Sequence, residues 1–161
     1  MLKLRKNKKG FTLVELIVVI AIMAVLAGTV AGVTVSQLNK QTDKTMATEA
    51  KGIADFISTW IIENNIDLTT AANLDAVKAS DNTTLIDALQ KQYGEEKVVS
   101  GAATDAKIGV SFVEGKKDET TADATKNVIK VEYKGKQSGT KGDVSYTVNA
   151  EGIVAKVPAA K

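Results

Sequence analysis

The distribution of apolar residues divides the chain into two unlike parts. Residues 16–39 contain no charged residue and are dense in Val, Ile, Ala, Leu and Met. At about 1.5 Å per residue, a helix over this run is roughly 36 Å long, which is enough to cross a bilayer core of about 30 Å. Basic residues, but no acidic ones, precede Gly10, so we expect the N-terminal flank to stay on the inner side of the membrane.

The apolar run continues into an amphipathic helical pattern. Apolar positions recur in steps of three and four on one stripe: Leu38, Met46, Ala50, Ile53, Ile57, Trp60 and Ile61. Charged residues fall on the other side: Lys44, Lys51, Asp55 and Glu63. Because no proline interrupts residues 11–65, the pattern predicts one helix of about 55 residues, roughly 80 Å long. The second half of that helix is expected to pack on a domain, with Trp60, Phe56, Ile57 and Ile61 in its core.

The rest of the chain changes from helical to strand patterns. Asp67 or Thr69 is a candidate start for a short helix, and Thr83 or Thr84 for a second one that ends at Gly94. Alternation then predicts strands over residues 108–112, 128–133, 144–148 and 153–157. The expected fold is α+β, with the long N-terminal helix packed against a C-terminal antiparallel sheet of three to four strands.

These patterns predict three segments. Residues 1–10 form a basic leader, residues 11–35 an apolar transmembrane helix, and residues 36–161 a globular head. Within the head we expect an amphipathic helix half (36–65), a helical connection (66–97) and a β-meander (98–161).

Composition excludes several kinds of chemistry. The chain has no Cys and no His, which excludes disulfides, thiolate sites, Ser-His-Asp catalysis and most zinc sites. The net charge is +2, but five of the 21 basic residues lie before Gly10. Without these five, 16 basic residues remain against 19 acidic ones, which gives a net charge of −3. Lysines of the sheet region are interspersed with acids, so we expect a solvated surface and no nucleic-acid partner. No enzymatic site and no cofactor is predicted.

One loop of the sheet region contains a group of acidic residues. Asp118, Glu119 and Asp123 gather carboxylates within residues 115–127. Their spacing matches no defined calcium loop, so no metal site is predicted.

Glu15 is the unusual residue at the entrance of the apolar run. A carboxylate near hydrocarbon costs a few kcal/mol unless a cation accompanies it. No Lys or Arg lies between Gly10 and Lys40. Cutting the chain after Gly10 would create a cation, the α-amino group of Phe11. Chain geometry favours the amine of a neighbouring copy, and a contact repeated between identical chains builds a filament.

The same residues carry a family resemblance. The basic leader followed by Gly-Phe-Thr-Leu-Val-Glu-Leu at residues 10–16 strongly resembles the class III signal of type IV pilins and their relatives, the pseudopilins. The resemblance covers residues 1–65 well and the remainder only in outline. It implies cleavage between Gly10 and Phe11 by a prepilin peptidase that also N-methylates Phe11. It further implies a membrane-anchored precursor that polymerises into an extracellular homo-oligomeric filament, assisted by a platform protein and a cytoplasmic ATPase.

Two departures from the family are visible. Many pilins have a proline where this chain has Gly32, and that proline accompanies local melting of the helix. Gly28 and Gly32 are therefore predicted to provide helix flexibility; their G-x-x-x-G spacing equally permits close helix approach. The terminal disulfide of many Gram-negative pilins is also absent, which points toward a Gram-positive pilus system.

Other interpretations remain open at this stage. The first is a pseudopilin of a type II secretion or DNA-uptake system. The second is a secreted soluble binding protein cut by ordinary signal peptidase between Ala27 and Gly28, and the third is an uncleaved single-span anchor. Glu15 argues against an ordinary signal peptide, because such signals avoid charge in their apolar region.

Overall fold

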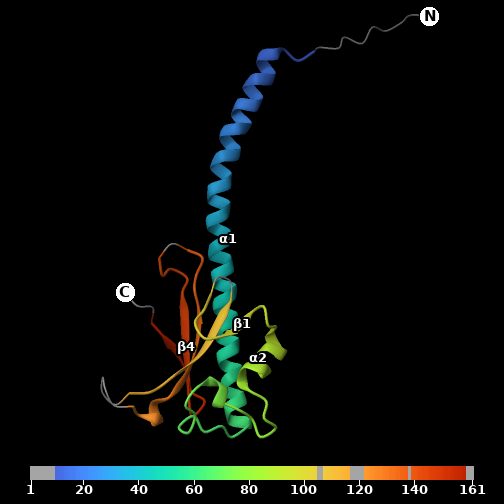
Figure 1. Ribbon diagram of the computed structural model, residues 1–161. Helices are drawn as coiled ribbons and strands as arrows, with labels where there is room; N and C mark the ends of the chain where they lie inside the picture. Colours follow the sequence, from blue (N-terminus) through green and yellow to red (C-terminus); the bar gives the residue numbers. More distant parts are fainter. Residues whose placement is uncertain (1–9, 105–106, 117–121, 138, 159–161) are drawn as a thin grey trace, which may run out of the picture. The chain divides into compact units, whose positions relative to one another are not determined.

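The computed structural model describes residues 10–104, 107–116, 122–137 and 139–158 (Figure 1). The predicted leader falls almost wholly outside these residues. The chain divides into two compact units at Leu38, residues 1–38 and 39–161, and each is described by itself.

One helix, α1 (Leu13–Glu63), accounts for 51 residues. The prediction of a long continuous N-terminal helix is therefore confirmed, with ends two residues inside the expected 11–65. In the first unit, every residue from 10 to 38 whose side chain is described is exposed.

The second unit contains a five-stranded sheet in the order β1-β2-β3-β4-β5. Its strands are β1 (Val98–Ser100), β2 (Ile108–Val113), β3 (Val128–Tyr133), β4 (Val144–Asn149) and β5 (Val154–Val157). The four strands from β2 to β5 are antiparallel neighbours and correspond to the four predicted ones. The sheet has one strand more than expected, because β1 pairs in parallel with β2 and has three residues, too few to show alternation.

The connection between α1 and the sheet differs from the prediction in its first half. Asp67 does not start a helix there, because its carboxylate accepts from the Thr69 N–H and hydroxyl and closes a turn. A short 3-10 helix, η1 (Leu74–Ala76), follows. The second predicted helix is confirmed as α2 (Leu85–Tyr93), which begins with a capping box between Thr84 and Asp87 and ends at Gly94. A second 3-10 helix, η2 (Ala124–Lys126), precedes β3.

The core forms where the second part of α1 meets the sheet and the connection. Its members share near-complete burial: Ala50, Ile53, Ala54, Ile57, Trp60 and Ile61 of α1, Leu85 and Leu89 of α2, and Ile108, Val110, Ile129, Val131, Tyr133, Tyr146 and Val148 of the sheet. The predicted core group around Trp60 is confirmed, with Phe56 half-buried and its ring 6.0 Å from that of Tyr93 in an edge-to-face contact. Because each strand buries only one of its faces, buried and half-buried residues alternate along β3 and along most of β4.

Asp43 fastens the β3–β4 loop to α1. Its carboxylate is 3% exposed and accepts three hydrogen bonds, from Tyr133 Oη (3.0 Å), Lys136 N (2.8 Å) and Gln137 Nε2 (2.7 Å). Gly142 adopts a left-handed φ of +90°, and a Cβ there would come within 2.7 Å of the Asp43 Cγ atom. We call this set of contacts the Asp43 clasp.

The clasp shifts the titration of both its ionisable members. Burial alone raises the pKa of Asp43, but the hydrogen bonds from Lys136, Gln137 and Tyr133 outweigh it and the net pKa is lowered. Burial, then the bond to the Asp43 carboxylate, raises the pKa of Tyr133 to about 12. The clasp therefore favours a charged aspartate and a neutral tyrosine.

Candidate functional site at the start of the long helix

The bond between Gly10 and Phe11 lies outside secondary structure. α1 begins at Leu13, so Gly10, Phe11 and Thr12 precede the helix. The Phe11 side chain is 91% exposed, and a Cβ built on Gly10 would meet no atom within 4 Å. A peptidase needs an accessible bond that is not part of a regular helix or strand, and the exposed residues Gly10 and Phe11 meet this condition.

Thr12 and Glu15 form a capping box at the helix start. Glu15 Oε2 accepts from Thr12 N and from Thr12 Oγ1, both at 2.8 Å. In return the Glu15 N–H donates to Thr12 Oγ1 at 3.2 Å. These bonds satisfy N-terminal N–H groups that an α-helix leaves unpaired, and they place a negative charge at the positive end of the helix dipole.

The capping box adds Thr12 to the residues singled out from the sequence. The pattern Thr-x-x-Glu before an apolar run is a recognised helix-start signal, and it was available in residues 12–15. The backbone N–H and the hydroxyl of Thr12 both donate to Oε2, and Glu15 Oε1 accepts no hydrogen bond from the described residues. One carboxylate oxygen thus remains for a further partner.

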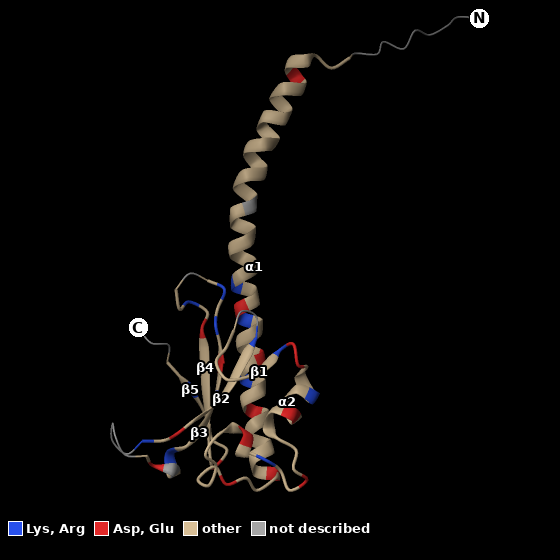
Figure 2. Cartoon of the chain, in the orientation of Figure 1, with Lys and Arg blue, Asp and Glu red and all other residues tan. Residues whose placement is uncertain are grey.

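The apolar run itself has the properties of a membrane span. The N-terminal part of α1 is long and apolar enough to cross a bilayer, and none of its most apolar stretch is buried. Figure 2 shows that charged residues are almost absent from this part of the helix. The hydroxyls inside the run donate to their own helix, Thr29 Oγ1 to the Leu26 carbonyl and Thr34 Oγ1 to the Val30 carbonyl, both at 2.9 Å. Such self-satisfied polar groups are compatible with a lipid environment, where no water is present to pair them.

Gly28 and Gly32 lie within the continuous helix. A Cβ at either position would meet no atom within 4 Å, so no neighbouring group in the described chain requires glycine there. Their predicted role in helix flexibility stays a prediction.

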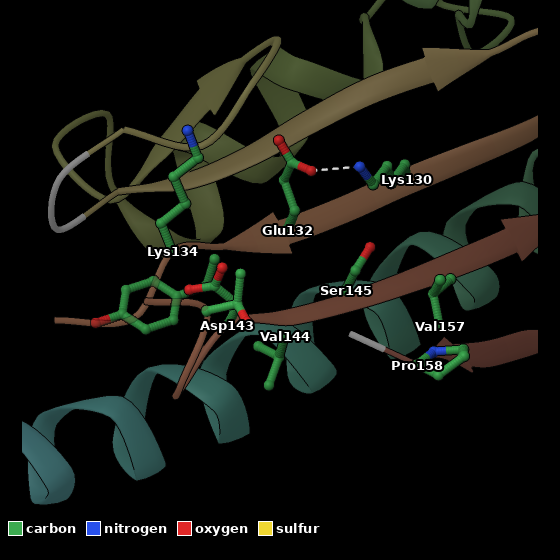
Figure 3. Close-up of a pocket in the computed structure, with 10 residues that line it drawn as sticks. Lys130, Glu132, Lys134, Asp143, Val144, Ser145, Val157 and Pro158 are labelled. Atoms are coloured by element: carbon green, nitrogen blue, oxygen red, sulfur yellow. Dashed lines mark ion pairs between the residues drawn. The ribbon is translucent and has the colours of Figure 1, made fainter. Parts of the chain in front are cut away.

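The other polar clusters serve the fold. The outer face of the sheet has a hollow of about 270 Å³ (Figure 3), and two residues that line it on β3 form an ion pair, Lys130 Nζ with Glu132 Oε2 at 2.5 Å. Glu132 Oε1 accepts from Ala103 N, so this carboxylate fixes a loop. The Asp123 carboxylate accepts hydrogen bonds from the N–H and hydroxyl of Thr125 and forms an ion pair with Lys126. Asp118 and Glu119 lie outside the described residues. No group of three potential metal ligands occurs among the described residues.

Comparison with known proteins bears on the same segment. A family model described as the prokaryotic N-terminal methylation motif matches residues 5–31, which include Gly10, Phe11 and Glu15. This motif is the class III signal of type IV pilins and pseudopilins, so the predicted resemblance is confirmed. Searches of curated proteins and of solved structures find no match to the chain.

The motif and the helix together support a coarse functional statement. The motif implies processing by a prepilin peptidase, and proteins of this class are structural rather than enzymatic. The exposed apolar helix fits a membrane-anchored precursor.

Proposed function

We propose that this chain is a structural subunit of a type IV pilus, cut between Gly10 and Phe11 and N-methylated at Phe11. The subunit polymerises through the first part of α1. The observation that carries the proposal is the Glu15 carboxylate, held by Thr12 at the start of α1 and followed by the uncharged apolar run of residues 16–39. A charge in that position is costly for an isolated chain and useful for an assembled one.

The proposed assembly contact pairs Glu15 with the new amine of Phe11 in a neighbouring copy. Cleavage converts the Phe11 amide nitrogen into an ammonium group, the only cation in residues 11–39 of the cut chain. Glu15 Oε1 is the oxygen that the capping box leaves for it. In surroundings of low dielectric constant this ion pair fixes the axial register of two helices, while their apolar side chains leave the lipid for one another.

Pseudopilins share the same motif, so the alternative is a pseudopilin of a secretion or DNA-uptake system. The two functions differ in whether long surface filaments form. Electron microscopy of wild-type cells and of cells lacking the gene measures this difference directly: filaments that vanish with the gene support the pilus, and their absence from both supports the pseudopilin.

Processing is tested by mass spectrometry of the N-terminus in the membrane fraction. We expect N-methylated Phe11 as the first residue, and a Gly10→Leu variant that retains Met1 and stays in the membrane. A mature chain beginning at Gly28 would contradict the proposal in favour of ordinary secretion, and filaments made of uncut chains would contradict the cleavage step.

The assembly contact is tested by Glu15→Ala. Losing an interaction of a few kcal/mol in an apolar setting should reduce filament yield by more than about tenfold. Glu63→Ala, which removes an exposed carboxylate near the other end of α1, is the matched control and should leave yield unchanged. Wild-type filament yield from Glu15→Ala cells would refute the pairing.

A further inference from the structure

Charge is unevenly distributed over the head. Residues 39–161 contain 16 lysines and 18 acidic residues. Five of these lysines lie in two short segments, residues 40–47 and 134–143, which contain only two acids, whereas the rest of the head has 11 lysines and 16 acids. Taken together, the rest of the head is therefore net acidic, whereas these two segments are net basic.

The two segments are brought together by the Asp43 clasp. Lys136 N and Gln137 Nε2 donate to Asp43, which places the β3–β4 loop against α1. A groove of about 330 Å³ runs between them, lined by Lys40, Asp43, Lys44, Ala47, Gln137, Gly142 and Val144. We call five lysines the basic collar: Lys40, Lys44, Lys134, Lys136 and Lys141. Figure 2 draws lysines in blue, and blue positions occur both on α1 and on the loop that follows β3.

The charges of the basic collar are available to a partner. All five lysines are exposed, and none belongs to an ion pair among the described residues. The two acids of these segments accept hydrogen bonds from other groups. Asp43 accepts three in the clasp, and Asp143 accepts one from Gly135 N at 2.6 Å. Neither aspartate forms an ion pair with a collar lysine, and Lys134 interacts electrostatically with Glu132 of β3 (Figure 3).

The position of Lys40 directly after the apolar run relates the basic collar to the membrane surface. Lys40 is the first charged residue after the uncharged run 16–39 and lies within a helical turn of its end. When that run spans a bilayer, Lys40 must lie at the outer membrane surface. The clasp places the backbone of the β3–β4 loop, which carries Lys136 and Lys141, beside Asp43, less than one helical turn beyond Lys40.

We propose that the basic collar binds the phosphate groups of anionic phospholipids on the outer surface of the membrane before the subunit enters a filament. The inference rests on the proposed function in one respect, the membrane orientation of α1. Cleavage after Gly10 removes all five basic residues of the inner flank, so the collar becomes the remaining basic anchor of the cut chain. Each lysine at an anionic surface strengthens such binding by about fivefold, and salt weakens it.

The test measures lysine acetylation of the full, uncut chain in lipid nanodiscs, read by mass spectrometry. One disc contains phosphatidylcholine alone, and the other contains phosphatidylcholine with one third phosphatidylglycerol. We expect the collar lysines to react about fivefold more slowly in the anionic disc and to regain their reactivity at high salt. The exposed lysines Lys78, Lys91 and Lys116 are internal controls and should react equally in both discs.

A pair of charge-matched variants sharpens the result. Replacing Lys134, Lys136 and Lys141 with Gln should weaken the protection of Lys40 and Lys44. Replacing Lys78, Lys91 and Lys116 with Gln changes the total charge equally and should leave that protection intact.

Three outcomes would overturn the proposal. The first is equal collar reactivity in the two discs. The second is equal protection by dissolved glycerol phosphate in the uncharged disc, which would indicate a site for free phosphate. The third is protection that follows the number of copies per disc rather than lipid charge, which would indicate contact with a second copy. Because the precursor is neither cut nor polymerised here, failure of this test leaves the processing and filament tests unaffected.

Discussion

The two parts of α1 share one continuous backbone helix but differ in what their side chains contact. Residues 39–63 bury an apolar stripe under the sheet, whereas the described side chains of residues 13–38 are all exposed. Ile57 is fully buried, while Ile20, with the same side chain in the same helix, is 57% exposed. The hydrophobic effect therefore stabilises the second part within one chain, whereas the first part keeps an exposed apolar surface of the kind that marks membrane or protein contact sites.

Polar groups follow the same division. In the first part, Thr29 and Thr34 are satisfied by their own helix, and Glu15 by its capping box. In the second part, Asp43 is satisfied by tertiary partners on β3 and the loop behind it. Local pairing of polar groups is what a helix needs in lipid, where no water is present to pair them, whereas a head that folds as a unit can use tertiary partners.

The largest expected effect contrasts the two isoleucines. Ile57→Ala should lower the free energy of unfolding of the head by about 3 kcal/mol, because it leaves a cavity in a close-packed core. Ile20→Ala should change it by less than about 0.5 kcal/mol. Urea unfolding in detergent, followed by fluorescence of the single tryptophan, Trp60, measures both. Equal losses for the two variants would mean that the first part of α1 contributes to head stability.

The Asp43 clasp should give the next largest effect. Asp43→Ala leaves buried donors without their charged acceptor and should cost about 2 kcal/mol, whereas Tyr133→Phe removes one bond and should cost about 1 kcal/mol. The same urea measurement applies. An Asp43→Ala variant with the same free energy of unfolding as wild type would show that the loop is held by other contacts.

The clasp also predicts a pH dependence with a definite sign. The folded pKa of Asp43 lies below its usual 3.8, so its stabilisation is complete above that value and is lost as pH falls through the folded pKa. The pKa of Tyr133 is raised to about 12 from 10.0, so its contribution is complete below pH 10 and is lost between about pH 10 and 12. Unfolding curves of Asp43→Asn should show a weaker acid dependence than wild type, and Tyr133→Phe a weaker alkaline one. If the free energy of unfolding of either variant depended on pH as it does in wild type, the corresponding role of Asp43 or Tyr133 would be contradicted.

The smallest effect is expected in the first part of α1. Gly28→Ala and Gly32→Ala should each stabilise the helix by about 1 kcal/mol, since nothing in the described chain obstructs a Cβ there. Hydrogen exchange of filaments should be faster over residues 26–34 in wild type than in the double variant. Slow exchange throughout this segment in wild-type filaments would refute the predicted flexibility.

The sequence was informative wherever a local pattern had a local cause. The apolar run and the three-four spacing predicted α1, and Thr84 and Gly94 predicted α2 through its caps. The prediction of a helix at Asp67 was wrong because the same carboxylate caps a turn equally well, and spacing alone does not distinguish the two. β1 was missed because a three-residue strand is defined by its partner rather than by its own pattern.

At the candidate site, the chemistry was readable from the sequence and the placement was not. Gly10, Phe11 and Glu15 follow from consecutive residues and the charge gap behind them, whereas the Thr12 bonds that orient Glu15 emerged from the structure. The basic collar joins lysines that are about 90 residues apart in the chain. The sequence by itself determined the apolar run and its single acid and predicted the cut position, because these depend on neighbours along the chain. The Asp43 clasp, and with it the gathering of the collar, was decided only by tertiary structure, because a buried carboxylate takes its donors from wherever the fold brings them.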